Sequence, residues 1–326
     1  MRPSLPTRWL AALAGLFFLA CAPLRAQTIR LSFPPDPNAL PVFVLQAKQK
    51  EWLPQDKLEL KANPSGDPSA MRAMIASGDM DYALFNLVGG VRFVQGGMRN
   101  VHLVSPWVWR GIYLLTPVDA EGRATALSAL QGKTVAVSPG LSTPPQIVTQ
   151  KALQKIGVKA DFIAAGSGTV LMNLLRDPSR APAGFAAAEP MVSQVLLRQQ
   201  QENWPVRWAV ALDPTQTLGT EIPLGALWQI GNSLPAAARE RFVAALQRAA
   251  QWANDPRNQA EAARIAAKGY ADFFRQPVPP QAFENMLQAH RVVWRMDDAA
   301  TARPVVERYL KDVFGIAMPP ALFITP

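Results

Sequence analysis

Short polar residues stand directly after several predicted strands, where a parallel sheet presents its ligand-binding edge. Ser142 and Thr143 follow the β-branched run 133–137 and precede a predicted helix whose first turn holds Pro144 and Pro145. A helix N-terminus carries N–H groups that suit an anionic or polar ligand. An ordinary strand-to-helix turn explains the same pattern, so both interpretations stay open here.

Two more residues occupy matching places in the two halves of the chain. Asn86 stands where a predicted strand gives way to a helix, and its amide offers two donors and one acceptor. Glu189 holds the equivalent place in the second half, where it would accept a hydrogen bond from an amine ligand. Each residue would also serve as a simple helix cap, and Glu189 would fit poorly beside an oxyanion.

Two loops carry further candidate ligand-binding residues. Ser167 and Thr169 lie in the loop that follows the next predicted strand, 161–165. Asp36 and Asn38 lie in the first loop of the chain, which three prolines stiffen. A stiff loop suits a preorganised site, although it also suits a plain turn.

Trp109 and Arg110 end a predicted strand beside a crossing between the two halves. Trp109 shares a strand face with Trp107, while Arg110 points to the other face. Arg110 is the best single candidate for pairing an anionic ligand, and a salt-bridged hinge arginine is the alternative. A core or interface role for the two tryptophans is the alternative to an aromatic floor in the site.

Catalytic and metal-binding patterns are missing from the sequence. His102 and His290 have no partner at catalytic or metal-ligand spacing, and no Ser-His-Asp order, paired carboxylates or phosphate loop is present. Cys21 is the single cysteine and lies in a predicted export signal, so the mature chain has no thiol chemistry. We therefore expect a protein that is not an enzyme and has no cofactor and no metal.

The first 26 residues have the pattern of a signal peptide: a basic start, an apolar run and a small residue before Gln27. We expect secretion to the periplasm, with lipidation at Cys21 as the less favoured alternative. Removal of Arg2, Arg8 and Arg25 lowers the 33 basic residues to 30 against 24 acidic ones, so the net charge falls from +9 to +6. This mild excess, without a basic block, does not indicate nucleic acid.

Strands and helices alternate twice along the mature chain, which predicts two doubly wound, parallel sheets. Helical patterns over 234–254, 258–268, 280–294 and 299–314 predict a C-terminal helical wrap that returns to the first lobe. Residues 109–120 and 212–225 are interpreted as the two crossings, so a hinge is expected. The predicted organisation is signal peptide 1–26, lobe 1 at 27–109 and 224–326, and lobe 2 at 110–223.

Three segments resemble landmarks of one family: SGDMDYA at 77–83, LQGKTVAV at 130–137 and AEPMV at 188–192. In this order they are similar to periplasmic substrate-binding proteins of ABC importers, in the nitrate/sulfonate/taurine branch that also includes thiamine-precursor binders. The resemblance implies an α/β, two-lobed periplasmic-binding-protein fold of type II that closes on a small molecule and docks on a membrane permease.

The expected ligand is small and polar, and we expect an anion held between the helix N-termini at Asn86 and at Ser142–Thr143, with Arg110 near the cleft. A cationic or pyrimidine-type ligand is the alternative, with Glu189 as its anchor. An exported enzyme or a sensor module on the same fold is the alternative function. The chain is expected to act as a monomer with an importer permease as its partner.

Overall fold

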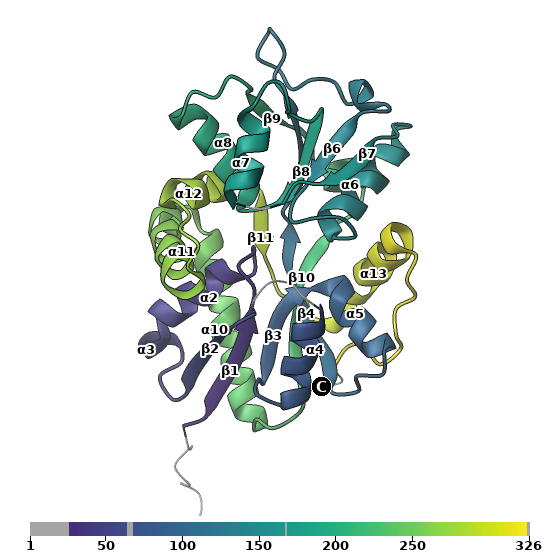
Figure 1. The fold of residues 1–326 in the computed structure, drawn as a ribbon. Coiled ribbons are helices and arrows are strands. Elements are labelled where there is room, and N and C mark those ends of the chain that lie inside the picture. Colours follow the sequence, from purple (N-terminus) through teal and green to yellow (C-terminus); the bar gives the residue numbers. More distant parts are fainter. Residues whose placement is uncertain (1–25, 64–67, 167, 325–326) are drawn as a thin grey trace, which may run out of the picture.

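The computed structural model describes residues 26–63, 68–166 and 168–324. Two lobes lie one above the other, each built on a single sheet with helices on both faces (Figure 1). The α/β, two-lobed architecture expected from the sequence is confirmed. The predicted signal peptide and Cys21 fall outside the described residues, apart from Ala26 at its end.

The lower lobe contains a six-stranded sheet. In spatial order its strands are β11 (Val292–Trp294), β4 (Val101–Arg110), β10 (Pro223–Ile230), β3 (Tyr82–Asn86), β1 (Thr28–Phe33) and β2 (Lys57–Ala62). Alternation along β3 decides which helices cover it, because Tyr82 stacks on Phe242 on one face and Phe85 packs on Phe93 on the other.

The helices of the lower lobe come from both ends of the chain. They are α2 (Ala39–Ala47), α3 (Gln49–Trp52), α4 (Pro68–Ser77), α5 (Leu87–Gln95), α10 (Ala236–Asn254), η2 (Pro256–Asn258), α11 (Gln259–Phe274), α12 (Pro280–Gln288), α13 (Ala299–Tyr309) and η3 (Leu310–Phe314). Phe33 packs against Phe43 of α2 and against Phe273 of α11, so the C-terminal helices complete the core begun by β1.

The upper lobe contains a five-stranded sheet. Its strands in spatial order are β7 (Asp161–Ala164), β6 (Thr134–Val137), β8 (Gly184–Ala188), β5 (Ile112–Pro117) and β9 (Trp208–Leu212). Its helices are η1 (Leu127–Leu130), α6 (Pro144–Lys155), α7 (Gly168–Arg176), α8 (Met191–Gln201) and α9 (Pro214–Leu218). Separate apolar clusters pack α7 and α8 on one face of the sheet and α6 on the other.

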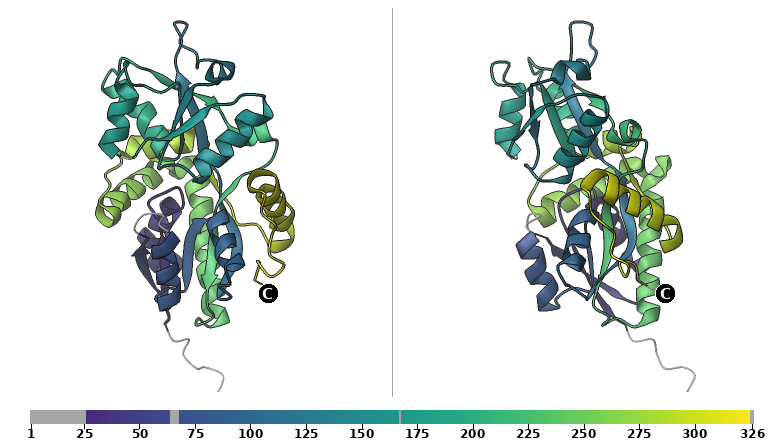
Figure 2. Two further views of the ribbon diagram at one scale, coloured as in Figure 1. Left: turned by 45° about the vertical axis from the view of Figure 1, so that its right-hand side comes forward. Right: turned by 90° about the vertical axis from the view of Figure 1, so that its right-hand side faces the viewer.

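The two sheets repeat one strand order. β2, β1, β3, β10 and β4 correspond in position to β7, β6, β8, β5 and β9. In each sheet the fourth strand of this order runs antiparallel to its neighbours, and it is the strand that carries the chain across from the other lobe. The carboxyl ends of the parallel strands in both sheets therefore point toward the junction between the lobes (Figures 1 and 2).

The sequence interpretation of the crossings was wrong in one respect. Within the predicted crossings 109–120 and 212–225, residues 112–117 form β5 and residues 223–225 begin β10 (Pro223–Ile230), and both are central strands of the two sheets. Both sheets are consequently mixed rather than parallel. β10 is buried along its whole length, so it lacks the alternation that marks a strand with one exposed face.

The predicted helix 280–294 was also wrong at its end. α12 stops at Gln288, and Val292–Trp294 form β11, which pairs antiparallel with the end of β4. Two valines and a tryptophan fit a strand better than a helix terminus. The helical wrap itself is present: α12 packs on α8 of the upper lobe, and α11 packs on α2 of the lower one.

The lobe boundaries at 109/110 and 223/224 stay a prediction. α12 packs on α11 of the lower lobe and also on α8 of the upper lobe, so residues 289–291, between α12 and β11, form a third connection at the junction of the lobes. Among the helices described, none combines the length and the apolar character that a membrane span requires.

Candidate functional site

Asp36 and Asn38 lie in the loop that follows β1, at the junction of the lobes. The Oδ1 atom of Asp36 accepts hydrogen bonds from the backbone N–H of Asn38 at 2.8 Å and from its Nδ2 at 2.7 Å. The Tyr270 hydroxyl donates to the backbone oxygen of Asp36 at 2.6 Å, which anchors the loop to α11. Burial raises the pKa of the Asp36 carboxyl to about 7, and the bonds from Asn38 act in the opposite direction.

Asn38 contacts the backbone of β10 at a glycine. Its side chain is buried and its Oδ1 has no hydrogen-bond partner. A Cβ atom on Gly225 would stand 2.3 Å from this Oδ1, so only glycine allows Asn38 to lie there. Gly225 is paired with Asn86 in the register of β10 and β3, so Asn38 and Asn86 both lie at this point of β10.

Asn86 is the N-cap of α5. Its Oδ1 accepts a hydrogen bond from the backbone N–H of Gly89 at 2.6 Å, which confirms the capping interpretation. Asn63 lies nearby along the same edge, since its N–H donates to the backbone oxygen of Phe33 at 2.9 Å. Its Oδ1 is a second buried acceptor without a partner, and the sequence analysis missed it.

Ser142 and Thr143 stand after the carboxyl end of β6, as expected, but one polar group of each already has a partner within the protein. The N–H of Ser142 donates to the side-chain oxygen of Gln146 at 2.6 Å, and the Thr143 hydroxyl donates to the backbone oxygen of Gly140 at 2.6 Å. The first two residues of α6 are prolines, which have no N–H. The start of α6 therefore offers fewer donors for an anion than predicted.

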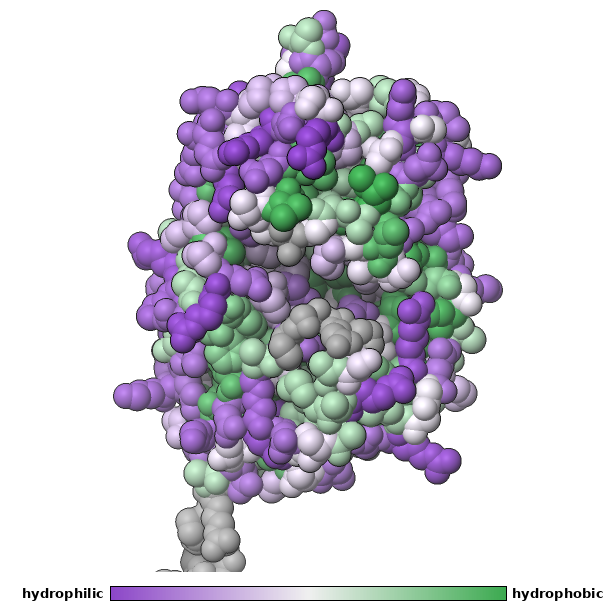
Figure 3. Space-filling model, viewed as in Figure 1, coloured by the Kyte–Doolittle hydropathy of each residue, from purple (hydrophilic) through white to green (hydrophobic). Residues whose placement is uncertain are grey.

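Thr169, the other described candidate of the upper lobe's loops, is exposed. Thr169 lies in the first turn of α7, and Ser167 falls outside the described residues. Leu141, Ile163 and Val170 expose 47%, 43% and 69% of their surface. Figure 3 shows hydrophobic side chains gathered on the upper lobe, above the hollow that separates the two lobes.

Glu189 lies on the hinge side of the junction and is fully enclosed. Its two carboxylate oxygens accept from the N–H and the hydroxyl of Ser193, each at 3.0 Å, so it caps α8. Arg291 lies 3.7 Å from Glu189 and donates to the Ser193 hydroxyl at 2.8 Å. Burial raises the pKa of the Glu189 carboxyl to about 7, although Arg291 and Ser193 lower it.

Arg110 forms part of the hinge. It has a left-handed backbone with φ of 68°, and its guanidinium pairs with Asp213 of the second crossing. The same guanidinium donates to the backbone oxygen of His290 at 3.4 Å, in the third connection. This cation therefore has a partner within the protein, in agreement with the alternative of a salt-bridged hinge arginine.

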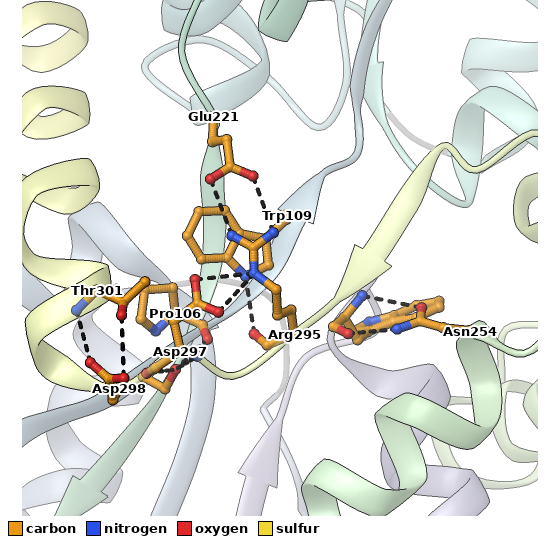
Figure 4. A network of polar contacts seen from close by, with 10 residues as sticks. Pro106, Trp109, Glu221, Asn254, Arg295, Asp297, Asp298 and Thr301 are labelled. Atoms are coloured by element: carbon orange, nitrogen blue, oxygen red, sulfur yellow. Dashed lines mark hydrogen bonds and ion pairs between the residues drawn. The ribbon is translucent and has the colours of Figure 1, made fainter.

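Trp109 lies inside the hinge, beneath Arg295 (Figure 4). The guanidinium of Arg295 stacks 4.0 Å from the Trp109 ring, and the indole N–H donates to the Arg295 backbone oxygen at 3.0 Å. Arg295 also binds both oxygens of Glu221 and both oxygens of Asp297. Trp109 is 1% exposed, so it cannot form the floor of an open site in this conformation.

The structure thus separates the predicted residues into two groups. Asp36, Asn38 and Asn86 come together at the lower edge of the cleft, whereas Trp109, Arg110 and Glu189 form the hinge. The sequence analysis missed Gly225 and Arg291, because both join these groups from distant parts of the chain.

One groove, of about 350 Å³, borders the hinge group at Arg110, Asp213 and Arg291. A groove of about 930 Å³ lies on the flank of the upper lobe between α8, β9 and α12. Within 26–63, 68–166 and 168–324, no three His, Cys, Asp or Glu side chains are grouped so that they could hold a metal ion.

Comparison with known proteins gives a clear result for the fold. No family model and no curated protein sequence matches the chain. Among solved structures, the periplasmic aliphatic sulphonate-binding protein SsuA from Escherichia coli has a TM-score of 0.66 and 15% identity, over 92% of each chain.

Two further structures extend the likeness. The ligand-binding component of an ABC-type import system from Staphylococcus aureus, with zinc bound, has a TM-score of 0.65 and 15% identity, over 92% of this chain and 97% of the other. The nitrate-binding protein NrtA from Synechocystis has a TM-score of 0.53 and 17% identity, over 81% of this chain and 69% of the other. The chain has the fold of these solute-binding proteins, as the sequence resemblance predicted.

Proposed function

We propose that this protein is the extracytoplasmic solute-binding component of an ABC importer. It captures a small polar ligand between its lobes and delivers that ligand to a membrane permease, acting as a monomer without catalysis. The observation that carries the proposal is that both sheets have the same strand order. The carboxyl ends of their parallel strands face each other across the junction. Ligands bind at such edges and at lobe interfaces.

The solved structures of this fold support the same role. The proteins from Escherichia coli and Synechocystis are periplasmic binding proteins, and that from Staphylococcus aureus is a component of an import system. A periplasmic location, reached through the signal peptide at 1–26, accordingly belongs to the proposal.

The anionic ligand predicted from the sequence stays a prediction. The names of the Escherichia coli and Synechocystis proteins, which include sulphonate and nitrate, support it. The Arg110 cation and the start of α6 support an anionic ligand less than the sequence suggested. Arg110 already pairs with Asp213, and α6 begins with two prolines, which have no N–H.

Small-angle scattering of residues 27–326 tests the proposal. A compound that binds between the lobes has a higher affinity for the closed form than for the open form. The radius of gyration should therefore fall when the compound is saturating. Deletion of the importer permease with which this protein is proposed to act should abolish uptake of the same compound. An unchanged scattering profile with a bound ligand, together with unimpaired uptake, would contradict the proposal.

A further inference from the structure

The amide of Asn38 has only one tenable orientation. Its Nδ2 donates to the Oδ1 of Asp36 at 2.7 Å, whereas the flipped amide would place two acceptors against each other. The Oδ1 of Asn38 is therefore a true acceptor without a donor, on a side chain that is 2% exposed. Buried acceptors without a donor are uncommon in folded proteins, which points to a donor supplied from outside the chain.

Asp36 adds a negative charge beside this acceptor. Both described hydrogen bonds of its side chain reach Oδ1 and none reaches Oδ2, and the residue is partly exposed. Within the described part of the chain, no lysine or arginine forms an ion pair with Asp36, and the Tyr270 hydroxyl of α11 is a titratable group that contacts the residue through its backbone oxygen. Among the described residues, the lower edge of the cleft thus holds an acceptor of Asn38 without a donor beside a carboxylate without an ion-pair partner.

The opposite side of the cleft has a different character. Leu141 and Val170 follow β6 and β7 at the carboxyl edge of the upper sheet, and both are strongly exposed. Hydrophobic side chains gather above the hollow in Figure 3, over the start of α7 and of α6. Such a surface favours an apolar body rather than a small hydrated ion.

We propose that the ligand is an organic cation with two unlike ends, whose donor-bearing head binds Asp36 and Asn38 and whose apolar body lies against Leu141 and Val170. This inference rests on the proposed function and specifies its ligand. The head carries several N–H groups, as an ammonium or amidinium does, and the two ends bind different lobes. Closure is then required to bind both ends at once.

Three probes with one ring and different charge test the head group. Benzylamine, benzyl alcohol and benzenesulfonate are titrated calorimetrically into residues 27–326 near neutral pH. Benzylamine should bind at least about tenfold more tightly than the other two, because it alone supplies charged donors. Tighter binding of benzenesulfonate, or no binding of benzylamine at millimolar concentration, would overturn the inference.

Matched variants test which residues bind each end of the ligand. Asp36→Asn keeps an acceptor for the Asn38 bonds but removes the charge, so benzylamine affinity should fall by about tenfold or more. Asp79→Asn, on an exposed turn, is the control and should change nothing. Val170→Ser should weaken benzylamine several-fold and leave methylamine unaffected; equal losses for both amines would refute the assignment of the apolar end.

Proton release gives an independent readout. A bound cation favours the ionised form of Asp36, so benzylamine binding should release protons, measured as a heat that differs between buffers of different ionisation enthalpy. Asp36→Asn should abolish this release, whereas Glu189→Gln should keep it. A release that survives in Asp36→Asn would overturn the role of Asp36.

The outcomes also separate this inference from the proposed function. Binding of benzenesulfonate with a smaller radius of gyration would retain a solute-binding protein and reject the cationic ligand. Binding of benzylamine without any change in scattering would reject closure and the two-ended binding inferred here, and unimpaired uptake without the permease would then reject the proposed function as well.

Discussion

The carboxyl group of Glu189 is buried between a helix N-terminus and a cation, yet its pKa is raised to about 7. Desolvation outweighs the favourable contacts with Arg291 and Ser193. Since the native state holds this proton more tightly than the unfolded chain does, the stabilisation is complete at acidic pH and is lost as the pH rises toward 7.

Glu189→Gln should therefore flatten the pH dependence of stability. The variant should gain stability relative to the native protein as the pH rises from about 5 to about 8, by on the order of 3 kcal/mol at most. Urea denaturation at the two pH values measures this difference. Glu240→Gln, at an exposed position, serves as the control. Parallel curves for Glu189→Gln and the native protein would contradict the prediction.

Arg110 combines an ion pair with an unfavourable backbone. Its φ of 68° costs a non-glycine residue about 1 kcal/mol, and its guanidinium compensates by pairing with Asp213. Arg110→Ala should lose the pair and keep the strain, whereas Arg110→Gly should lose the pair and relieve the strain.

Both variants should consequently be less stable than the native protein, and the glycine variant should exceed the alanine variant by about 1 kcal/mol. Urea denaturation of the two proteins checks this order. A pronounced loss of ligand affinity in Arg110→Ala with unchanged stability would instead restore Arg110 as a ligand-binding residue.

At the scale of elements, α11 and α2 approach closely because α11 contains Gly269. A Cβ atom on this residue would stand 2.3 Å from the ring of Phe43. The ring cannot retreat, since it also packs on Phe33, Tyr270 and Phe273. The contact holds the C-terminal helices against the first helix of the mature chain.

Gly269→Ala should be destabilising although alanine is the better helix former. Helix propensity would gain about 1 kcal/mol, while overpacking typically costs 1–3 kcal/mol or more where the neighbours cannot move, so a loss is expected. The midpoint of urea denaturation measures it. Gly140→Ala, whose Cβ would have no neighbour closer than 4.0 Å, should have little effect. A more stable Gly269→Ala would show that the helices can separate.

The sequence predicted those elements whose pattern is local. β1, β2 and β6 stand between clear turns, and Asn86 was recognised as a cap or a ligand. β5 and β10 were missed because a fully buried central strand has no alternation, and its pairing depends on residues far away. The contact of Asn38 with Gly225 depends on that same strand, so its geometry could not be predicted from the loop alone.

At the scale of the molecule, the junction is held on one side by three polar connections. Arg110 pairs with Asp213, Arg291 contacts Glu189, and the Tyr113 hydroxyl donates to the backbone oxygen of Arg291 at 2.9 Å. All three bonds meet at residues that connect the lobes. We expect the lobes to rotate about this side, so that the cleft opens on the opposite one.

The lobes should also differ as independent folding units. Residues 110–223 contain every strand of the upper sheet, whereas residues 27–109 lack β10, which lies between β3 and β4. The fragment 110–223 should unfold cooperatively in urea, and the fragment 27–109 should not. Circular dichroism of the two fragments measures this, and a cooperative transition in 27–109 would contradict it.

The central place of β10 has a consequence for synthesis. A ribosome makes β1 to β4 first, and β1, β2 and β3 can pair with one another, but β4 cannot join their sheet until the strand starting at Pro223 has emerged. The upper lobe is translated without interruption in the meantime. The edge that brings Asp36 and Asn38 beside Gly225 is therefore assembled late, after the lobe it faces has already been made.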